Sequence, residues 1–594
     1  MSKNELLTKC NELGFTNCKS KKKDELIGLI NSKIDTKEEN LENKYKSNSF
    51  ENINSKIIIQ INQLFHNKGI KQEDRFELLL NILDGNKDTK YFDIKNLIDN
   101  LDYNNTELIQ EIFMKIGSKY TKFNLDQFYT PLTISQFINK LMIVDENNNA
   151  IDPAGGTGDL LLYYKGNKTI WDIDENALKL CKFNYTLHKQ INYILDCKNS
   201  LNDFEDYMNK YTYCVMNPPF GSNTIITDKQ ILNKYELGKG KSKQEIGILF
   251  LELGLKLLKE NGILLIIVPA GYVGNLNKNC SDMRDLILKN RLIASISLPE
   301  NTFKRSGTGV NTYLLIIQKI NIENNNIFIN RVENIGYNLT KKDTPLKYKI
   351  VKETGELIID KNFKPILDND LIDVYYSLSN FINDNYIINL NFEINIYNEY
   401  EYINKNQLSY NILDVKRYLK NYLDIITYLK SIQFVKLNLL CNIITSTTKI
   451  DNKKLYKYID ISEINSPLYG HKILYGWELP SRAKYSLKKY DILISKLEGT
   501  MSYCVILDDS NNYISTNGVC VLRPNNLDNL YILFSNIMNK HFKIQHNAFL
   551  TGSIMASLSD EDIKNFLIDV KTIDIELSKK ILDTLENLQK LKSN

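Results

Sequence analysis

The sequence predicts an α/β core, with a helical region before it and an α+β region after it. Two stretches in the middle of the chain predict strands of this core. The apolar run 213–216 has the length of a buried parallel strand, and it ends at two prolines, which can continue neither a helix nor a strand. The stretch 150–160 has the pattern of a strand, a glycine-rich turn and a helix. Apolar residues recur at helical spacing before residue 120, and short alternating strands are predicted after residue 411.

Composition limits the classes of protein to which the chain can belong. The 594 residues suffice for about three to five domains, and the apolar fraction of 43% suffices for packed cores. No apolar run approaches the length of about 18 residues that a membrane span needs, and the first residues lack the apolar segment of a secretion signal. The nine cysteines include no CxxC pair and the five histidines are dispersed, which argues against disulfides and structural zinc. With a net charge of only +4, any surface that binds nucleic acid must be basic locally.

The first 34 residues are predicted to form two short helices. Apolar residues recur at helical spacing on both sides of the lysine cluster 19–23. This unit is similar to the SAP module, a helix–turn–helix-like DNA-binding motif, in Leu13-Gly14 and in the segment 21–27. If the unit is a SAP module, its lysines contact DNA phosphates, and these contacts do not depend on the base sequence. The alternative is a solvated helical hairpin that does not bind DNA. Residues 35–49 are polar and are predicted to be a linker.

A helical domain is predicted for residues 50–120, because apolar residues repeat there with a helical period. The α/β core is predicted to extend over residues 121–340. Near its start, Thr130-Pro131 precedes an apolar helical pattern, and proline is tolerated at the first position of a helix.

The glycine-rich turn follows Ala150 and Ile151 and continues into the predicted helix. It consists of Asp152, Pro153, Ala154, Gly155, Gly156, Thr157, Gly158 and Asp159. Such a turn lets the backbone approach a ligand closely, although the GxGxxG pattern of dinucleotide-binding loops is absent. Asp172 follows the next apolar step, where an acidic side chain at a strand end can bind ribose hydroxyls. A plain βα turn is the alternative interpretation.

The segment Asn217-Pro218-Pro219-Phe220 is rigid and extended, and it follows the predicted strand 213–216. Ligands of open α/β sheets bind at the carboxyl ends of the strands. The Asn217 side-chain oxygen and the Pro218 carbonyl can each accept one hydrogen of an amino group on a planar base, while Phe220 stacks on its ring. The alternative is a proline-rich turn with a capping asparagine.

The order of these features resembles that of the amino-methyltransferases of DNA. The resemblance is closest to the modification subunit of type I restriction–modification systems and its single-chain relatives, and it covers residues of about 120–340. The cofactor loop precedes the catalytic segment, which is the order of the gamma group. Further similarity lies in the helix 248–259, the strand 263–269, Leu298-Pro299-Glu300 with Phe303, and Gly309–Thr312 before the strand 313–317.

The resemblance implies a Rossmann-like, S-adenosylmethionine-dependent methyltransferase core that acts on adenine N6 of a flipped-out base. It assigns catalysis to Asn217, Pro218, Pro219 and Phe220. It assigns binding of S-adenosylmethionine to Gln127, Tyr129, Thr130, Pro131, Asp152, Ala154, Gly155, Gly156, Thr157, Gly158, Asp159, Asp172 and Asn199. Asn199 departs from the acid that the family commonly has there. Asn217 favours adenine, because the N4-cytosine branch usually has serine at this position. No metal is expected.

The remaining chain is predicted to be a connector, residues 341–410, followed by a target-recognition domain, residues 411–594. Residues 490–496 and 514–518 resemble the target-recognition domain of type I specificity subunits, and the helical pattern 577–591 resembles the helix that follows it. An unrelated α+β domain or a self-association module is the alternative. The basic side chains that could reach phosphates or base edges are Lys449, Lys453, Arg482 and Lys496.

The predicted function is site-specific methylation of adenine N6 in double-stranded DNA. Two alternatives remain open: methylation of RNA or of a protein glutamine, and a catalytically silent DNA-binding specificity protein. Expected partners are duplex DNA and either a second copy of the chain or a separate specificity or endonuclease protein, since no nuclease motif is visible. The expected location is the prokaryotic cytoplasm, or the cytoplasm or nucleus of a host if a large DNA virus encodes the chain.

Overall fold

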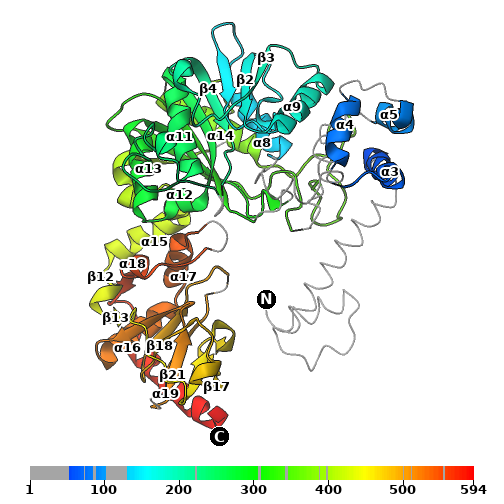
Figure 1. The fold of residues 1–594 in the computed structure, drawn as a ribbon. Helices are drawn as coiled ribbons and strands as arrows, with labels where there is room; N and C mark the ends of the chain where they lie inside the picture. Colours follow the sequence, from blue (N-terminus) through cyan, green and yellow to red (C-terminus); the bar gives the residue numbers. More distant parts are fainter. Residues whose placement is uncertain are drawn as a thin grey trace. The chain divides into compact units, whose positions relative to one another are not determined.

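The computed structural model of the chain falls into two compact units, which we describe separately (Figure 1). It describes residues 53–72, 74–83, 89–101, 130–220, 224–304, 309–340, 346–386, 388, 390–395, 399–499, 501–509, 512–552 and 556–593. The SAP-like module predicted for residues 1–34, the linker predicted for residues 35–49, Gln127 and Tyr129 lie outside the described residues.

The first unit comprises residues 1–127, 179–189 and 336–369. Its described helices α3 (Ile53–Asn67), α4 (Arg75–Leu83) and α5 (Phe92–Asp99) lie within the range predicted to be helical. Ile58 and Phe65 of α3 pack with Ile94 of α5 in a fully buried apolar cluster. The described part of residues 346–369 forms an antiparallel arm, which includes the bridge between Tyr348 and Leu367.

The second unit contains a nine-stranded sheet in the order β11-β10-β8-β9-β7-β4-β1-β2-β3. Its strands are β1 (Asn149–Asp152), β2 (Asn167–Asp172), β3 (Tyr193–Cys197), β4 (Tyr211–Met216), β7 (Leu258–Pro269), β8 (Arg291–Ser297), β9 (Thr312–Gln318), β10 (Asn326–Arg331) and β11 (Glu401–Asn404). Neighbours from β7 through β3 are parallel, whereas β9 runs antiparallel to both β7 and β8. The carboxyl ends of β4, β1 and β2 therefore meet at one edge of the sheet.

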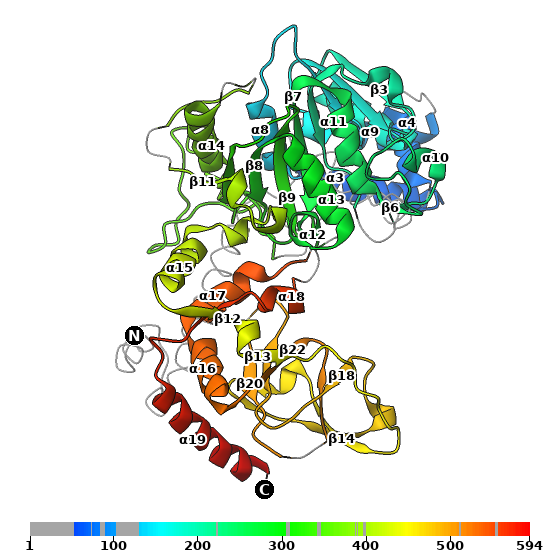
Figure 2. The same ribbon diagram turned by 90° about the vertical axis from the view of Figure 1, so that its left-hand side faces the viewer.

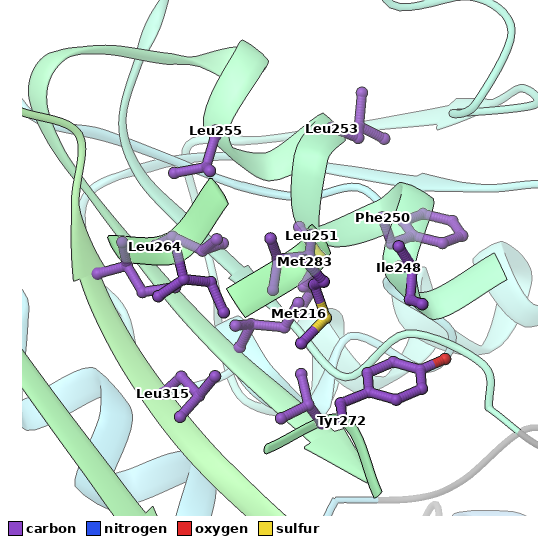
Figure 3. Packing of buried hydrophobic residues seen from close by; sticks show 14 of the residues in the cluster. Met216, Ile248, Phe250, Leu251, Leu253, Leu255, Leu264, Tyr272, Met283 and Leu315 are labelled. Atoms are coloured by element: carbon purple, nitrogen blue, oxygen red, sulfur yellow. The ribbon is translucent and has the colours of Figure 1, made fainter. Parts of the chain in front are cut away.

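Helices cover both faces of this sheet (Figures 1 and 2). On one face, α11 (Ile246–Leu257) and α13 (Lys278–Lys289) pack against strands β4, β7 and β9 in one apolar cluster, part of which Figure 3 shows. On the other face, Phe381 of α14 (Leu371–Asn385) packs on Phe328 of β10, with ring centroids 5.7 Å apart. Because both faces are buried, the central strands are continuous apolar runs, as predicted for the core.

Local structure differs from the sequence prediction at three places. The helix predicted for residues 248–259 ends at Leu257, because Leu258 pairs with Tyr211 in the parallel ladder of β7 and β4. The glycine-rich turn leads into a short 3₁₀ helix, Asp159–Leu161, instead of an α-helix. Within the predicted connector, α14 and β11 are regular elements, and β11 pairs with β10 at the edge of the sheet.

The C-terminal part of this unit has an α+β fold that begins with α15 (Lys420–Ser431). One four-stranded sheet has the order β13-β22-β19-β20, and a second has the order β17-β14-β21-β18. Their strands are β13 (Cys441–Ile443), β14 (Leu455–Ile459), β17 (Lys472–Tyr475), β18 (Ala483–Ser486), β19 (Ile492–Ser495), β20 (Tyr503–Val505), β21 (Tyr513–Thr516) and β22 (Val519–Pro524). Helices α16 (Leu527–Met538), α17 (Lys540–Phe549) and α19 (Ile575–Ser593) pack with the first sheet.

Shorter or peripheral elements complete the described structure. They are α8 (Leu132–Leu141), α9 (Glu175–Leu187), α10 (Lys229–Leu232), α12 (Ala270–Gly274), α18 (Asp560–Ile563), β5 (Ile225–Ile226), β6 (Gln244–Glu245), β12 (Phe434–Lys436), β15 (Ile464–Asn465), β16 (Leu468–Tyr469) and β23 (Leu567–Asp569). Among the described helices, none combines the length and the apolar character that crossing a membrane requires.

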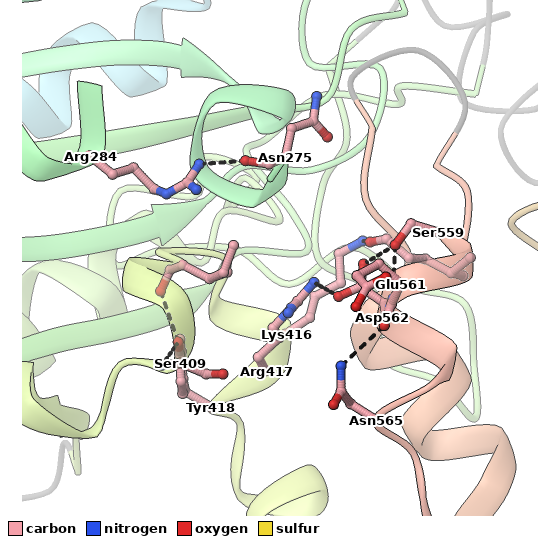
Figure 4. A network of polar contacts seen from close by, with 12 residues as sticks. Asn275, Arg284, Ser409, Lys416, Arg417, Tyr418, Ser559, Glu561, Asp562 and Asn565 are labelled. Carbon is pink, nitrogen blue, oxygen red and sulfur yellow. Dashed lines mark hydrogen bonds and ion pairs between the residues drawn. The ribbon is translucent and has the colours of Figure 1, made fainter. Parts of the chain in front are cut away.

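A buried polar network joins the core to the α+β domain (Figure 4). The Arg417 guanidinium lies 3.2 Å from a carboxylate oxygen of Asp562, and both side chains are almost fully buried. The same guanidinium lies 4.3 Å from the ring centroid of Phe549. Close by in the sequence, Asp414 accepts a hydrogen bond of 2.7 Å from the Tyr313 hydroxyl of β9. The segment 414–417 therefore contacts the core through Asp414 and the α+β domain through Arg417.

Candidate active site

The segment Asn217–Phe220 begins where strand β4 ends. Strand β4 is completely buried between β1 and β7, so that Asn217 emerges at the carboxyl edge of the sheet, as predicted. The side-chain nitrogen of Asn217 donates a hydrogen bond of 3.2 Å to the hydroxyl of Thr130, which lies just before helix α8. Because the amide is planar, this bond turns the Asn217 oxygen away from Thr130.

The aromatic ring of Phe220 is held by a second ring. Phe220 is only 2% exposed, and its centroid lies 6.1 Å from that of Phe303 in an edge-to-face arrangement. Phe303 belongs to a turn in which the Thr302 hydroxyl donates to the Pro299 carbonyl at 2.6 Å. The sequence analysis identified Phe303 as part of a motif, but local pattern gave no signal that it contacts Phe220.

The glycine-rich turn is folded against the end of strand β2. The Gly155 N–H donates to the Trp171 carbonyl at 2.9 Å, and a Cβ at Gly155 would lie only 2.2 Å from a methyl group of Ile170. Gly158 has a φ of +77°, which glycine adopts without strain. These two glycines let the turn fold closely against the end of β2.

Asp172 connects the turn to strand β2. One of its carboxylate oxygens accepts the Gly156 N–H at 2.8 Å, and the other accepts the Asp174 N–H at 2.9 Å. Burial raises the pKa of the Asp172 carboxyl above its usual value. The carboxylate therefore holds the turn in place at the position where we predicted a ribose contact.

Two further carboxyl groups lie under the turn. Asp152 is 1% exposed, and burial together with the nearby Asp172 and Asp159 carboxylates raises its pKa to about 8, although the Ala154 N–H donates to it. Asp159 is also buried and accepts a hydrogen bond of 2.9 Å from the Thr157 hydroxyl. Three clustered carboxyl groups suit a cation, and S-adenosylmethionine carries an ammonium group and a sulfonium group.

Asn199 and Ser200 shape the turn after strand β3. The Asn199 side-chain oxygen accepts the Leu201 N–H at 3.2 Å. The Asn199 amide therefore forms this turn at the position where the sequence analysis expected an acidic residue. The Ser200 hydroxyl donates to the Pro153 carbonyl at 2.5 Å, which connects this turn to the glycine-rich turn. Ile173, which the sequence analysis did not single out, follows Asp172, and 68% of its surface is exposed.

Of the four basic residues named from the sequence, two form ion pairs and two are exposed. Lys496 lies 2.7 Å from Asp560 and is 13% exposed, and Arg482 pairs with Asp460. Lys449 and Lys453 are exposed.

Comparison with known protein families identifies the core. The family model described as N-6 DNA Methylase matches residues 106–407, just over half of the chain. The chain belongs to this family. The model described as Type I restriction modification DNA specificity domain matches residues 429–594. No curated protein matches the chain. This N-6 DNA methylase thus joins a methyltransferase core to a specificity domain, and it is an enzyme that methylates adenine N6 in DNA with S-adenosylmethionine as donor.

Several solved structures are similar to this N-6 DNA methylase. The type I restriction–modification methyltransferase subunit from Streptococcus thermophilus is 17% identical over 55% of this chain and 74% of its own, with a TM-score of 0.36. The type IIG restriction endonuclease BpuSI is 14% identical over 95% of this chain and 77% of its own, with a TM-score of 0.43. The HsdS subunit from Thermoanaerobacter tengcongensis is 19% identical over 27% of this chain and 43% of its own, with a TM-score of 0.22. The family assignment rests on the family models.

Proposed function

We propose that this enzyme methylates adenine at specific sites of double-stranded DNA, and that its own C-terminal domain selects those sites. The observation that supports the catalytic assignment is the fixed orientation of the Asn217 amide at the carboxyl end of β4. The acidic turn that follows β1 lies at the same edge of the sheet, because β1 and β4 are parallel neighbours.

Adenine N6 is a poor nucleophile, because its lone pair is delocalised into the ring. We assign two acceptors to its amino hydrogens: the side-chain oxygen of Asn217 and the carbonyl oxygen of Pro218. Both acceptors stabilise the positive charge that develops on N6 during methyl transfer. The segment 217–220 contains neither histidine nor a carboxylate, so we assign no proton abstraction before transfer. N6 gains the methyl carbon as the carbon–sulfur bond breaks, and the extra proton on N6 leaves to water after transfer. Loss of one such preorganised contact lowers the rate by about a hundred- to a thousandfold.

S-adenosylmethionine supplies a methyl group activated by a positively charged sulfur. The backbone of residues 155–158 offers it a surface without side chains, except for Thr157. Asp172 would bind its ribose, and the exposed apolar side chain of Ile173 would be available to its adenine. The carboxyl groups of Asp152 and Asp159 would hold its positively charged groups. Thr130 and Pro131 would complete the donor pocket.

The target adenine must leave the duplex to reach this site. We assign Phe220 to stacking on the flipped base. Since Phe220 is buried against Phe303, a stacked base replaces contacts that the ring makes in this structure. We further propose that the enzyme works with a second copy of the chain or with a separate specificity or endonuclease protein, that any endonuclease is a separate protein, and that the enzyme acts in a prokaryotic cytoplasm or in the cytoplasm or nucleus of a virus-infected host cell.

Transfer of labelled methyl groups tests the function. We expect the enzyme to label duplex DNA at N6 of adenine, and to label neither RNA nor protein glutamine. Asn217→Ala should lose at least a hundredfold in rate while it binds S-adenosylmethionine with nearly unchanged affinity in calorimetry. Asn147→Ala, at an exposed asparagine of the same core, is the control. Labelling of RNA or protein in place of DNA, or tight DNA binding without any transfer, contradicts the proposal.

A further inference from the structure

An exposed aromatic pair lies at the end of the edge strand β17 and in the 3₁₀ turn, Gly476–Glu478, that follows it. The rings of Tyr475 and Trp477 are nearly parallel, at 13°, with centroids 6.4 Å apart. Tyr475 is 45% exposed and Trp477 is 68% exposed, as are Ile473 at 63% and Leu455 at 45%. Leu455 pairs with Tyr475 across the antiparallel strands β14 and β17, and Ile473 lies on the same face because side chains alternate along a strand. With Trp477, whose ring stacks on that of Tyr475, these residues form one exposed apolar face.

The turn that carries the pair is fixed by its own contacts. The Gly476 N–H donates to the Lys454 carbonyl at 2.9 Å, and a Cβ at Gly476 would lie 2.1 Å from the Asp451 carbonyl oxygen. The Tyr475 N–H donates to the Glu478 side chain at 2.8 Å. The two aromatic side chains are therefore presented on an ordered turn, which lowers the entropic cost of using them in binding.

The stretch of chain that contains these two strands is basic. Residues 449–489 include nine lysines and arginines against four acidic residues, an excess of +5, whereas the whole chain has a net charge of +4. Two of the nine are paired with acids outside the stretch, Lys457 with Asp508 and Lys489 with Glu586. Lys449, Lys453 and Lys454 are exposed, and Lys454 lies in the turn against which Gly476 packs. Lysine is depleted in protein–protein interfaces, so a polyanion fits this surface better than a second copy of the chain.

We propose that the exposed face of strands β14 and β17, with the turn that follows β17, binds duplex DNA, with Tyr475 and Trp477 against base edges and Lys449, Lys453 and Lys454 on phosphates. Strands β14 and β17 form the edge of a four-stranded sheet, since β14 also pairs with β21, and the exposed apolar side chains at this edge suit contacts with base edges and methyl groups in the major groove. This inference rests on the proposed action on duplex DNA, and it names the surface and the residues that hold the substrate.

Intrinsic fluorescence tests the contact directly, because the chain has two tryptophans and Trp171 is fully buried. Titration with a 30-base-pair duplex should quench the emission of the full-length protein. Trp477→Phe should abolish that quenching. Trp477→Ala should weaken DNA binding about tenfold, as truncation of one aromatic side chain at the centre of a binding surface predicts. Leu439→Ala, at a 64% exposed residue of the same domain, should change affinity less than twofold.

The salt dependence of DNA affinity tests the lysine contacts separately. Lys453→Ala combined with Lys454→Ala should reduce the slope of log affinity against log salt by about two, since each phosphate contact contributes about 0.9. Lys571→Ala, at an exposed lysine elsewhere in the domain, should leave the slope unchanged. S-adenosylmethionine binding checks that each variant is folded.

The inference is overturned if saturating duplex leaves Trp477 emission unchanged and Trp477→Ala binds DNA as tightly as the parent. It is also overturned if Trp477→Ala converts a dimer into a monomer without any loss of DNA affinity, because the face then joins two copies. Methylation of DNA alongside either result leaves the proposed function standing. Quenching without methylation of any DNA supports the surface and contradicts the proposed function.

Discussion

The side-chain nitrogen of Asn217 lies 3.2 Å from the hydroxyl oxygen of Thr130, although 87 residues separate the two in the sequence. This hydrogen bond joins the end of strand β4 to the start of helix α8. It determines which end of the amide faces away from Thr130. Only the oxygen can accept a hydrogen from an amino group, so the orientation of Asn217 determines whether the segment can bind adenine N6 productively.

Removal of the Thr130 hydroxyl should therefore reduce the rate of methyl transfer. In Thr130→Val the Asn217 amide can rotate, and we expect the single-turnover rate to fall about five- to tenfold, as for loss of about 1–1.5 kcal/mol of hydrogen bonding. Thr130→Ser keeps the hydroxyl and should stay within about twofold of the parent. Equal rates for the valine and serine variants would show that the bond does not orient Asn217.

The buried carboxyl of Asp152 predicts that donor binding depends on pH. Burial raises its pKa to about 8, so that it is protonated at neutral pH. A bound cation favours the ionised form and lowers this pKa, so binding of S-adenosylmethionine must release a proton. Donor affinity should therefore rise as the pH increases toward about 8. Calorimetry in buffers of different ionisation enthalpy measures the released proton, and Asp152→Asn should release none.

The same carboxyl affects stability with the opposite sign. Between its usual pKa of 3.8 and about 8, Asp152 holds a proton in the folded state that it loses in the unfolded state. The contribution of Asp152 to the free energy of unfolding therefore falls as the pH rises through this window. Without donor, Asp152→Asn should gain stability relative to the parent as the pH rises from about 5 to 8. Denaturant midpoints that differ equally at both pH values would contradict this.

Gly155 tests whether the turn must lie against strand β2. A Cβ at this position would be 2.2 Å from Ile170, so Gly155→Ala must displace the turn that carries the donor-binding groups. We expect S-adenosylmethionine affinity to fall at least tenfold, measured by calorimetry. The control is Gly309→Ala, whose Cβ would meet only the Asn301 side chain, at 3.5 Å. If both variants bind the donor equally, the turn does not form the donor site.

Local signals predicted the strand ends and the turn. The prolines after Met216 and the glycines after Asp152 interrupt regular secondary structure through backbone conformation alone. In the structure, the proline segment and the glycine-rich turn both lie at the carboxyl edge of the sheet. Strand β11 gave no such signal, because two of its four side chains are exposed and it pairs at the edge of the sheet. An edge strand of four residues lacks the apolar run by which a buried strand is recognised.

Long-range partners could not be predicted from local pattern. The contact between Phe220 and Phe303, and the bond between Thr130 and Asn217, depend on which strands are neighbours in the sheet. Charge alone also does not reveal a partner. Lys496 has the sequence context of an exposed lysine, yet the fold brings Asp560 within 2.7 Å of it.

The buried pair of Arg417 and Asp562 predicts the sharpest loss of stability. The Ser559 hydroxyl donates a hydrogen bond of 2.7 Å to the Asp562 carboxylate and accepts one of 3.0 Å from the Asp562 N–H. These bonds hold the Asp562 side chain in place beside Arg417. Asp562→Asn leaves the guanidinium buried without a counter-charge, and we expect a loss of about 3–5 kcal/mol in the unfolding transition of the C-terminal domain. Loosening this contact should also raise the KM for DNA, because Arg417 joins that domain to the core.

A surface ion pair of the same helix provides the control. Lys564 and Glu561 lie 2.7 Å apart, with 40% and 64% of their side chains exposed. Lys564→Ala should therefore cost at most about 0.5 kcal/mol. Unfolding in urea is measured by limited proteolysis: cleavage within α15, the first helix of the C-terminal domain, reports that the domain has separated from the core. If Asp562→Asn and Lys564→Ala unfold at the same urea concentration, the Arg417–Asp562 pair does not hold the recognition domain on the core, and a raised KM for DNA would need another cause.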